Sequence, residues 1–497
     1  MLLIVTIISL LVYLLWRFGT RNFGYWQKKG VKHDKPIFLF GNMYRQFVQK
    51  TSLSEFIAET HERFPEEKYF GVHIANNLGL ILRDPELIKH VLATDFQYFH
   101  QRGVNPHKRI SEPLFKNLFT ADGDVWKLMR QRLTPAFSSG KLKAMFPLIV
   151  KTAEKMLSVI EPGHRDAKDL MARYTTDFIG TCGFGLDFDS LNDESSMFRR
   201  LGKRIFTITT RDAIIQMVKR VAPDICKHFH YFAPEIEENT LIIIKEILKK
   251  RNYQPSGRND FVDLLLELKQ KGKIVGQSIE HFYPDGTPKS VELELDDTMI
   301  AAQVFIFFAA GFETSSAASS FLLHELAFNP EVQERCQKEV DEVLSRHGGK
   351  ISYDAVKEMK YLEMAFKETI RLYPSPGFLL RRCGMKYAFP GTELTIDEDV
   401  YVVVSLLALQ RDPRFFENPG TFNPDRFSPH KAEDIRTCIG ERLGILQSLA
   451  GVCAVLSKFT VKPAPATRRH PLTDPRSGFV QNIIGGLPLS FELRGAS

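Results

Sequence analysis

The sequence predicts a mostly α-helical protein with small β-sheets, folded as a single large domain behind an N-terminal membrane anchor. Apolar residues recur at the helical period through most of residues 53–456, and strand-like alternation is confined to short stretches. No Gly/Ser-rich or Pro-rich linker divides the chain. With 44% hydrophobic and 25% charged residues among 497, the composition is that of a globular protein.

The first element is an apolar N-terminal segment. Residues 1–16 are almost entirely apolar, and Arg17 and further basic residues follow them. We expect an uncleaved anchor and not a signal peptide, because the charges come after the apolar run and no small-residue cleavage site is visible. The expected division is an anchor at 1–18, a basic linker at 19–40 and one domain at 41–497, with the body on the cytoplasmic side of the membrane.

Charge and cysteine usage narrow the function classes. Lysine and arginine outnumber aspartate and glutamate by 66 to 59, and the surplus is spread along the chain. This balance suits an acidic protein, an anionic lipid surface or ordinary solubility, and we expect no nucleic-acid partner. The six cysteines are scattered and form no CxxC pair, which indicates a reducing compartment and neither a disulfide framework nor a zinc site.

The body of the chain alternates between helical and short strand-like segments. The helical period is clearest at residues 124–137, 166–182, 241–250, 295–327, 330–347, 357–373 and 439–457. Alternation of apolar and polar residues predicts strands within residues 72–82, 391–404 and 487–493.

The long helix expected at 295–327 carries two polar residues in a buried setting. It is apolar on every face around Phe305–Phe312, yet Glu313 and Thr314 stand in its middle. A threonine beside Gly311 can bond back to the preceding turn and open the helix for a small ligand. A hydroxyl beside a carboxylate could then pass protons to that ligand. The alternative is a bent core helix with a solvated glutamate.

A charge cluster is expected near the end of the helix at 357–373. Glu368 and Arg371 are three residues apart and share one helical face. Arg426, in the later Pro-Asp-Arg-Phe segment, could complete a buried Glu–Arg–Arg cluster, in which the loss of one member strands a charge. We expect a structural lock here; the alternative is an ordinary surface ion pair of little energetic weight.

Two further constellations offer ligand-binding groups. Trp126 and Arg130 share a helical face and could together hold a carboxylate, although a core tryptophan on an amphipathic helix explains them equally. Cys438 precedes Gly440 and the helix expected at 439–457. A helix N-terminus stabilises a thiolate, which is the form that binds a metal. A lone cysteine can also be a small buried hydrophobic residue.

Four short motifs follow the anchor in a fixed order: Ala-Gly-Phe-Glu-Thr-Ser, Glu-x-x-Arg, Pro-Asp-Arg-Phe and Arg-x-Cys-x-Gly. In these motifs the chain resembles the cytochrome P-450 family of haem-thiolate monooxygenases. The resemblance covers the chain from Trp126 to the C-terminus and is greatest to the insect microsomal branch. It implies the cytochrome P-450 fold, with haem b (iron protoporphyrin IX) between the long helix and the cysteine. A thiolate ligand pushes electron density toward bound oxygen and favours O–O cleavage.

The resemblance also implies a role for each matching residue. Cys438 would be the axial iron ligand, and Glu313 and Thr314 would be the catalytic residues that activate oxygen. The propionates would be held by Trp126, Arg130, Arg381 and Arg436. The structural lock would consist of Glu368, Arg371 and Arg426.

The implied function is insertion of one oxygen atom into a lipophilic small molecule such as a xenobiotic, a hormone or a fatty-acid-like compound. Electrons would come from NADPH through a separate flavoprotein reductase, with cytochrome b5 as a further candidate partner. The implied location is the cytoplasmic face of the endoplasmic reticulum membrane. The implied substrate pocket draws on residues 105–118, 206–217, 304–309, 376–380 and 480–484. An oxygen-independent isomerase is disfavoured because Glu313 and Thr314 are both present.

The segment before the cysteine departs from the family pattern. The family has Phe-x-x-Gly-x-Arg-x-Cys-x-Gly, whereas Lys431 and Asp434 occupy the Phe and first Gly positions here, and Arg426 is only twelve positions from Cys438. A deletion near 431–435 explains both differences. The missing glycine allows the tight turn that brings N–H groups to the sulfur. The alternative hypothesis is therefore a non-catalytic family member, or a truncated product, with impaired haem binding.

Overall fold

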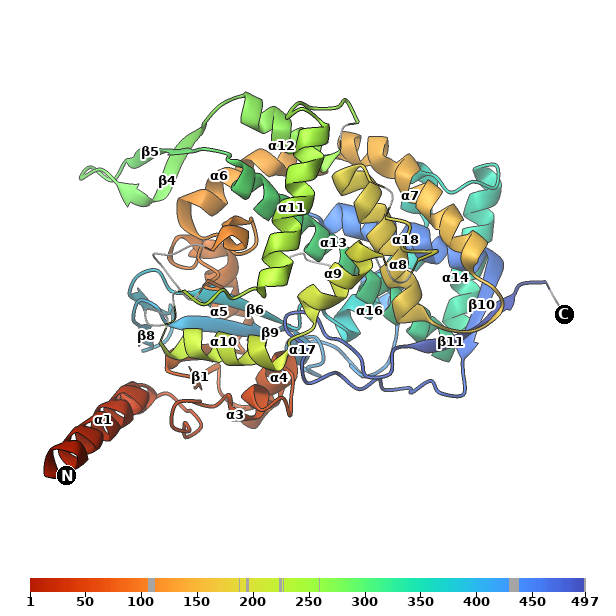
Figure 1. Cartoon of the computed structure of the whole chain (residues 1–497). Coiled ribbons are helices and arrows are strands. Elements are labelled where there is room, and N and C mark those ends of the chain that lie inside the picture. Colours follow the sequence, from red (N-terminus) through yellow and green to blue (C-terminus); the bar gives the residue numbers. More distant parts are fainter. Residues whose placement is uncertain are drawn as a thin grey trace.

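The computed structural model describes residues 1–105, 112–186, 188–193, 196–222, 226, 228–258, 260–428 and 438–495 (Figure 1). Helices dominate it, and the strands form small sheets at the periphery. The predicted fold class, mostly α with small β-sheets, is confirmed.

The helices fall into two runs along the chain. The N-terminal run comprises α1 (Leu2–Thr20), α2 (Tyr25–Lys28), α3 (Tyr44–Phe47), α4 (Leu53–Arg63), α5 (Pro85–Lys89), α6 (Gly123–Leu133), α7 (Ser139–Val159), α8 (Ala167–Ile179), α9 (Met197–Phe206) and α10 (Thr210–Val221). The C-terminal run comprises α11 (Pro234–Lys250), α12 (Phe261–Gln270), α13 (Asp297–Phe328), α14 (Pro330–Arg346), α15 (Tyr353–Glu358), α16 (Lys360–Leu372), α17 (Leu406–Leu409) and α18 (Glu441–Lys458).

The strands form four sheets in the described part of the chain. The largest has the order β1-β2-β9-β6, from β1 (Tyr69–Ile74), β2 (Asn77–Leu82), β9 (Tyr401–Ser405) and β6 (Phe378–Arg382). The second has the order β10-β11-β3, from β10 (Phe459–Pro463), β11 (Pro488–Leu493) and β3 (Gly163–Asp166). Two hairpins complete the set: β4 (Ile274–Phe282) with β5 (Pro288–Leu293), and β7 (Tyr387–Ala388) with β8 (Thr395–Ile396).

The largest sheet joins distant parts of the sequence. β1 and β2 pair as an antiparallel hairpin, and β2 pairs in parallel with β9, with Leu80 opposite Val402. β6 pairs antiparallel with β9 on the other side. Parallel pairing needs a long crossover connection, and here that connection carries most of the helical domain.

The core is built around α13, which passes through the middle of the helical body (Figure 1). Its N-terminus is capped by Asp296, whose carboxylate accepts a hydrogen bond from the Met299 amide at 2.6 Å. The helix packs against α8, α18, α16 and α11. Because apolar residues occur on all of its faces, it is stable only when surrounded by other helices.

Several sequence-based expectations differ from the structure in detail. The helix expected at 357–373 is two helices, α15 and α16, which meet at Met359. The strand region 72–82 is a hairpin that turns at Ala75, where φ is +52°. The long helix α7 and the β4–β5 hairpin were not predicted, since α7 contains Pro147 and the hairpin has a polar, irregular pattern.

The N-terminal helix α1 projects away from the body (Figure 1). Almost all of its side chains are exposed, including Trp16 and the leucines and isoleucines before it. By length and composition, α1 and α13 are the two described helices apolar enough to cross a membrane. α13 is mostly buried inside the domain, so only α1 offers a free apolar surface to lipid.

Candidate functional site

The centre of α13 has an unusual pattern of backbone hydrogen bonds. Three successive carbonyl oxygens each accept a hydrogen bond from a side chain, in addition to any bond within the helix. The donor–acceptor pairs are Thr314 Oγ1 to Ala310 O (2.6 Å), Gln447 Nε2 to Gly311 O (3.1 Å) and Thr175 Oγ1 to Phe312 O (3.0 Å). The expected back-bond of Thr314 to the preceding turn is present, but α13 remains an unbroken α-helix.

Gly311 and Ala310 show why small residues occur at this point. A Cβ atom on Gly311 would lie 2.5 Å from Ile179 Cδ1, so glycine permits the close approach of α8. Ala310 is exposed although it lies in the middle of a buried helix. Ala310 and Thr314 are one turn apart and share a face. This face of α13 is therefore not fully covered by neighbouring elements.

Glu313 points to a different side of the helix from Thr314. Its buried carboxylate forms an ion pair with Lys168 of α8, with a Nζ–Oε1 distance of 2.5 Å. The two residues line a polar pocket of about 320 Å³, to which Asp169, Arg199 and Arg476 also contribute. The two catalytic candidates are thus neighbours in sequence that face different environments, and Lys168 is a partner that the sequence pattern did not predict.

Cys438 lies just before α18, and its thiol is exposed. Burial lowers the pKa of the Arg130 guanidinium, and a Coulomb interaction with Cys438 opposes that shift. A Cβ atom on Gly440 would lie 3.9 Å from the Phe137 ring, which is 6.1 Å from the Phe307 ring on α13. Phe307, three residues before Ala310, links the cysteine segment to the exposed face of α13.

The remaining cofactor-binding candidates approach from two other elements. The Trp126 indole of α6 lies 5.6 Å from the Phe96 ring, centroid to centroid. Arg381 on β6 is buried, and its Nη1 donates to the Leu380 carbonyl at 2.8 Å. Its neighbour Arg382 forms an ion pair of 3.5 Å with Asp122, directly before α6, and so ties β6 to that helix.

One cofactor-binding candidate and the unusual cysteine approach are outside the described residues. Arg436, Lys431 and Asp434 all fall within 429–437. The structure therefore describes Trp126, Arg130, Arg381 and Cys438 of the predicted set, and it brings Arg130 within Coulomb range of Cys438.

The Glu–Arg–Arg cluster is assembled and buried. Glu368 is 0% exposed and Arg371 is 1% exposed, and Arg371 donates from Nε and Nη2 to the two carboxylate oxygens at 2.7 and 2.8 Å. Arg426 Nε and the Asn423 amide both donate to Glu368 Oε1, at 3.3 and 2.9 Å. Arg371 also donates to the carbonyl of Gln410 at 2.6 Å. The cluster thereby fixes α16 to the segment that leads toward Cys438.

The site belongs to a definite class of proteins. The site combines a thiol before a helix, a cationic side chain within Coulomb range of that thiol, and a long apolar helix with an exposed face. Such a site can hold a flat, anionic, metal-containing cofactor. Comparison with known proteins identifies the family. The family model "Cytochrome P450" matches residues 32–487.

Curated relatives of insect origin cover nearly the whole chain. Cytochrome P450 6B2 of Helicoverpa armigera is 34% identical, over 98% of this chain and 98% of its own length. Cytochrome P450 6a2 of Drosophila melanogaster is 35% identical, over 99% and 98%, and Cytochrome P450 6B5 of Papilio glaucus is 37% identical, over 94% and 99%. The chain belongs to the cytochrome P450 family, and its predicted likeness to the insect branch is confirmed.

Membership assigns the haem-thiolate cofactor and the monooxygenase class to this chain. The described residues fit that cofactor. Cys438 supplies an accessible thiol, Arg130 supplies a cation within Coulomb range of it, and Ala310 and Thr314 form an accessible face on the long helix. Such a set suits a haem, because the thiol would bind the iron and the cation would hold the propionate carboxylates.

Proposed function

We propose that this protein is a membrane-bound monooxygenase that inserts one atom of dioxygen into a lipophilic small molecule, such as a xenobiotic, a hormone or a fatty-acid-like compound. The observation that carries the proposal is the combination of the accessible Cys438 thiol, within Coulomb range of Arg130, with the exposed Ala310–Thr314 face of α13. A haem bound at this place would activate oxygen. The protein would provide the ligand of the iron, deliver protons and bind the substrate.

In this proposal the Cys438 thiolate would hold the haem iron, and Trp126, Arg130, Arg381 and Arg436 would hold the propionates. The hydrogen bond from Thr314 Oγ1 to Ala310 O fixes the hydroxyl on the exposed Ala310–Thr314 face of α13. Glu313 is the second proposed catalytic residue, and Lys168 holds its buried carboxylate on a different side of α13 from the Thr314 hydroxyl.

An apolar substrate is supported by the aromatic side chains around the proposed pocket. The Phe378 ring stacks on Phe479 at 5.5 Å, and the Phe305 ring lies 5.2 Å from Phe232. Such rings bury large apolar surfaces and offer few hydrogen-bonding groups. They favour a ligand that is recognised mainly by shape and burial.

The microsomal family implies a reductase partner. We propose an NADPH-dependent flavoprotein reductase, with cytochrome b5 as a second electron donor, at the cytoplasmic face of the endoplasmic reticulum. The proposed domain division is an α1 anchor at 1–18, a linker at 19–40 and the catalytic domain at 41–497. The exposed apolar surface of α1 and Arg17 at its end support this arrangement.

The shortened segment before Cys438 favours a second candidate function. A short connection from Arg426, without the family's Phe and first Gly, restricts how the sulfur reaches the iron. In this alternative the protein is a membrane-bound family member with impaired haem binding and no turnover, or a truncated product. Sequencing of the transcript across 430–437 tests the latter directly, since an intact Phe-x-x-Gly segment would restore the first function.

The two functions are separated by expressing the full chain with a reductase and recording the reduced-CO spectrum. The monooxygenase is expected to show the haem-thiolate band in near-stoichiometric amount and to consume NADPH with lipophilic substrates. Cys438→Ser is the control that removes this band. A second variant, with residues 429–437 replaced by the full-length segment of an insect relative, shows the capacity of the remaining site. Haem uptake in this variant alone would overturn the monooxygenase assignment for the natural chain.

A further inference from the structure

The β4–β5 hairpin extends from the helical body and lies against α6 (Figure 1). Asp124, in the first turn of α6, accepts hydrogen bonds from the Ser278 hydroxyl and the Ile279 amide, each at 2.6 Å. In return, the Glu280 carboxylate accepts a hydrogen bond from the Asp124 amide at 3.4 Å, and a Cβ atom on Gly123 would collide with that carboxylate. Asp124, Ser278, Ile279 and Glu280 thus form a clasp between the hairpin and the N-terminus of α6, where free N–H groups favour a negative charge.

The hairpin also packs closely along the length of α6. A Cβ atom on Gly276 would lie 2.5 Å from Leu128 Cδ2, so glycine permits this close approach of β4. The same helix carries Trp126 and Arg130, two of the cofactor-binding candidates. A displacement of the hairpin would therefore remove support from the helix that presents both side chains.

A buried histidine faces the carboxylate of the clasp. The His100 side chain is 6% exposed, and its Nε2 lies 3.8 Å from Glu280 Oε1. Its Nδ1 donates to the carbonyl oxygen of Gln97 at 3.0 Å, and since a carbonyl can only accept, Nδ1 carries a hydrogen in both charge states of the ring. Within the described residues Nε2 has no hydrogen-bond partner. In a neutral ring Nε2 would direct a lone pair at the carboxylate, whereas the imidazolium directs an N–H at it.

The surrounding groups favour the imidazolium. Burial alone would lower the pKa of His100, but Glu280, the Gln97 carbonyl and Asp122 outweigh burial, and the pKa is raised above 6.5. His100 in return lowers the pKa of the Glu280 carboxyl. The other charged groups around this pair, from the hairpin, α6, the loop before α6 and β6, are His281, Asp124, Asp122 and Arg382. Because the pKa of His100 is raised on folding, its contribution is complete below pH 6.5 and is lost as the pH rises through the raised value.

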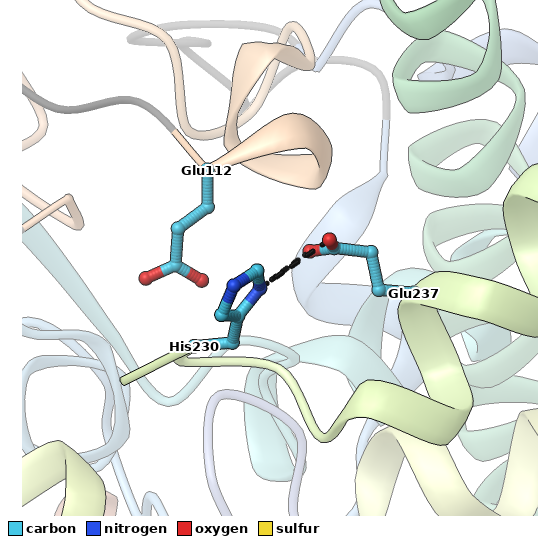
Figure 2. Close-up of side chains that lie close together, drawn as sticks. All are labelled: Glu112, His230 and Glu237. Atoms are coloured by element: carbon cyan, nitrogen blue, oxygen red, sulfur yellow. Dashed lines mark hydrogen bonds and ion pairs between the residues drawn. The ribbon is translucent and has the colours of Figure 1, made fainter. Parts of the chain in front are cut away.

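His230 shows why the burial of His100 matters. The His230 ring also lies between two carboxylates, those of Glu112 and Glu237, and its Nδ1 lies 3.3 Å from Glu237 (Figure 2). The His230 side chain is 48% exposed, however, so water can solvate either charge state. At His100 a neutral ring would leave a buried nitrogen unsatisfied beside a negative charge, which is costly. The charge of His100 is therefore coupled to the position of the hairpin.

We propose that His100 and Glu280 are positioning residues for the haem site, because the His100 imidazolium holds Glu280, and with it the β4–β5 hairpin, against the first turn of α6. The clasp fixes the helix that carries Trp126 and Arg130. As the pH rises, His100 releases its Nε2 proton to solvent, and the hairpin separates from α6. The consequence for haem rests on the proposed function, whereas the clasp consists of protein groups alone, so a test on the clasp does not depend on haem.

The experiment measures hydrogen exchange of the purified full-length chain by mass spectrometry over a pH series. Protection factors are corrected for the intrinsic pH dependence of exchange. Peptides from the hairpin and from α6 report on the clasp, and peptides from α16 are the internal reference. In the natural chain the protection of the hairpin and of α6 should fall about three-fold or more from about pH 6 to about pH 9, while that of α16 stays constant.

Four variants separate the charge of His100 from other causes. His100→Gln should abolish the pH dependence, because an amide does not titrate in this range. Glu280→Gln, at the more exposed end of the pair, should weaken it as well, which keeps the test decisive if His100→Gln does not fold. Ser278→Ala removes an uncharged bond of the same clasp and should lower protection equally at every pH. His281→Gln is the matched control, since His281 is an exposed histidine beside Glu280, and it should keep the natural pH dependence.

The proposal is overturned if hairpin and α6 peptides of the natural chain show no pH dependence beyond that of α16. It is equally overturned if both His100→Gln and Glu280→Gln retain the full pH dependence, or if His281→Gln abolishes it. Circular dichroism melting curves at about pH 6 identify the variants that fold like the natural chain.

Discussion

The most demanding test of the structural reasoning is the substitution Glu368→Gln in the buried lock. The change keeps the size of the side chain but removes the charge that faces Arg371. Both groups are almost completely buried, at 0% and 1% exposed, so the Arg371 guanidinium would lose its carboxylate while remaining away from water. Removing one partner of such a pair costs about 3–5 kcal/mol of the free energy of unfolding.

The other members of the lock should be ranked by their geometry. Arg426 makes a longer contact of 3.3 Å with Glu368, and its side chain is 14% exposed, so Arg426→Ala should cost only about 1–2 kcal/mol. Glu492→Gln, in the exposed ion pair with Lys462, is the matched control and should cost under about 1 kcal/mol. The assay is guanidinium unfolding of the detergent-solubilised chain, followed by circular dichroism.

A double variant, Glu368→Leu with Arg371→Met, tests the physical cause. If the cost of the single change arises from a stranded charge, the double variant should be more stable than the charge-stranding single variant. The two effects should then couple by about 2 kcal/mol or more. Additive effects, or an equal loss for Glu368→Gln and Glu492→Gln, would refute the reasoning.

Three further predictions concern other parts of the protein. Burial, with a contribution from Arg83, lowers the pKa of His61 from 6.5 to about 4. Between these pH values the unfolded chain binds a proton that the folded chain does not, so the free energy of unfolding should fall by about 3 kcal/mol from pH 6.5 to pH 4. Unfolding experiments at several pH values should show a weaker pH dependence for His61→Phe. Arg130→Leu should lower the haem content per chain several-fold, as measured by pyridine haemochrome, and an unchanged content would contradict the role proposed for Arg130. Gly71→Ala should destabilise the domain by about 1–3 kcal/mol, because the new methyl group would lie 2.4 Å from Trp26 Cγ. Thermal unfolding checks this prediction, and equal melting temperatures for the variant and the natural chain would show that Trp26 can move.

The sequence predicts those features that depend on local periodicity. The long apolar helix, the i to i+3 pair of Glu368 and Arg371 and the position of Cys438 before a helix all follow from neighbouring residues. The break at Met359 between α15 and α16 was not predicted, because residues 357–373 keep one amphipathic pattern across it.

Features that depend on distant partners could not be predicted in this way. Lys168 meets Glu313 across 145 positions, and Gln447 meets Gly311 across 136, so neither pair leaves a periodic signal. The same limit applies to the convergence of Glu112 with His230 and Glu237. In each case the polar residue looks like an ordinary surface residue until the helices that carry it are packed together.

The parallel pairing of β2 with β9 has a consequence for how the protein is made. The partner strand of β2 is encoded about 320 residues later. At roughly 5–20 residues per second, tens of seconds pass after α1 has emerged before that strand exists. During this interval the outer edge of the β1–β2 hairpin has unpaired N–H and C=O groups, which can pair with other chains. The hairpin edge of the nascent chain is therefore a site of mispairing until residues 401–405 have left the ribosome.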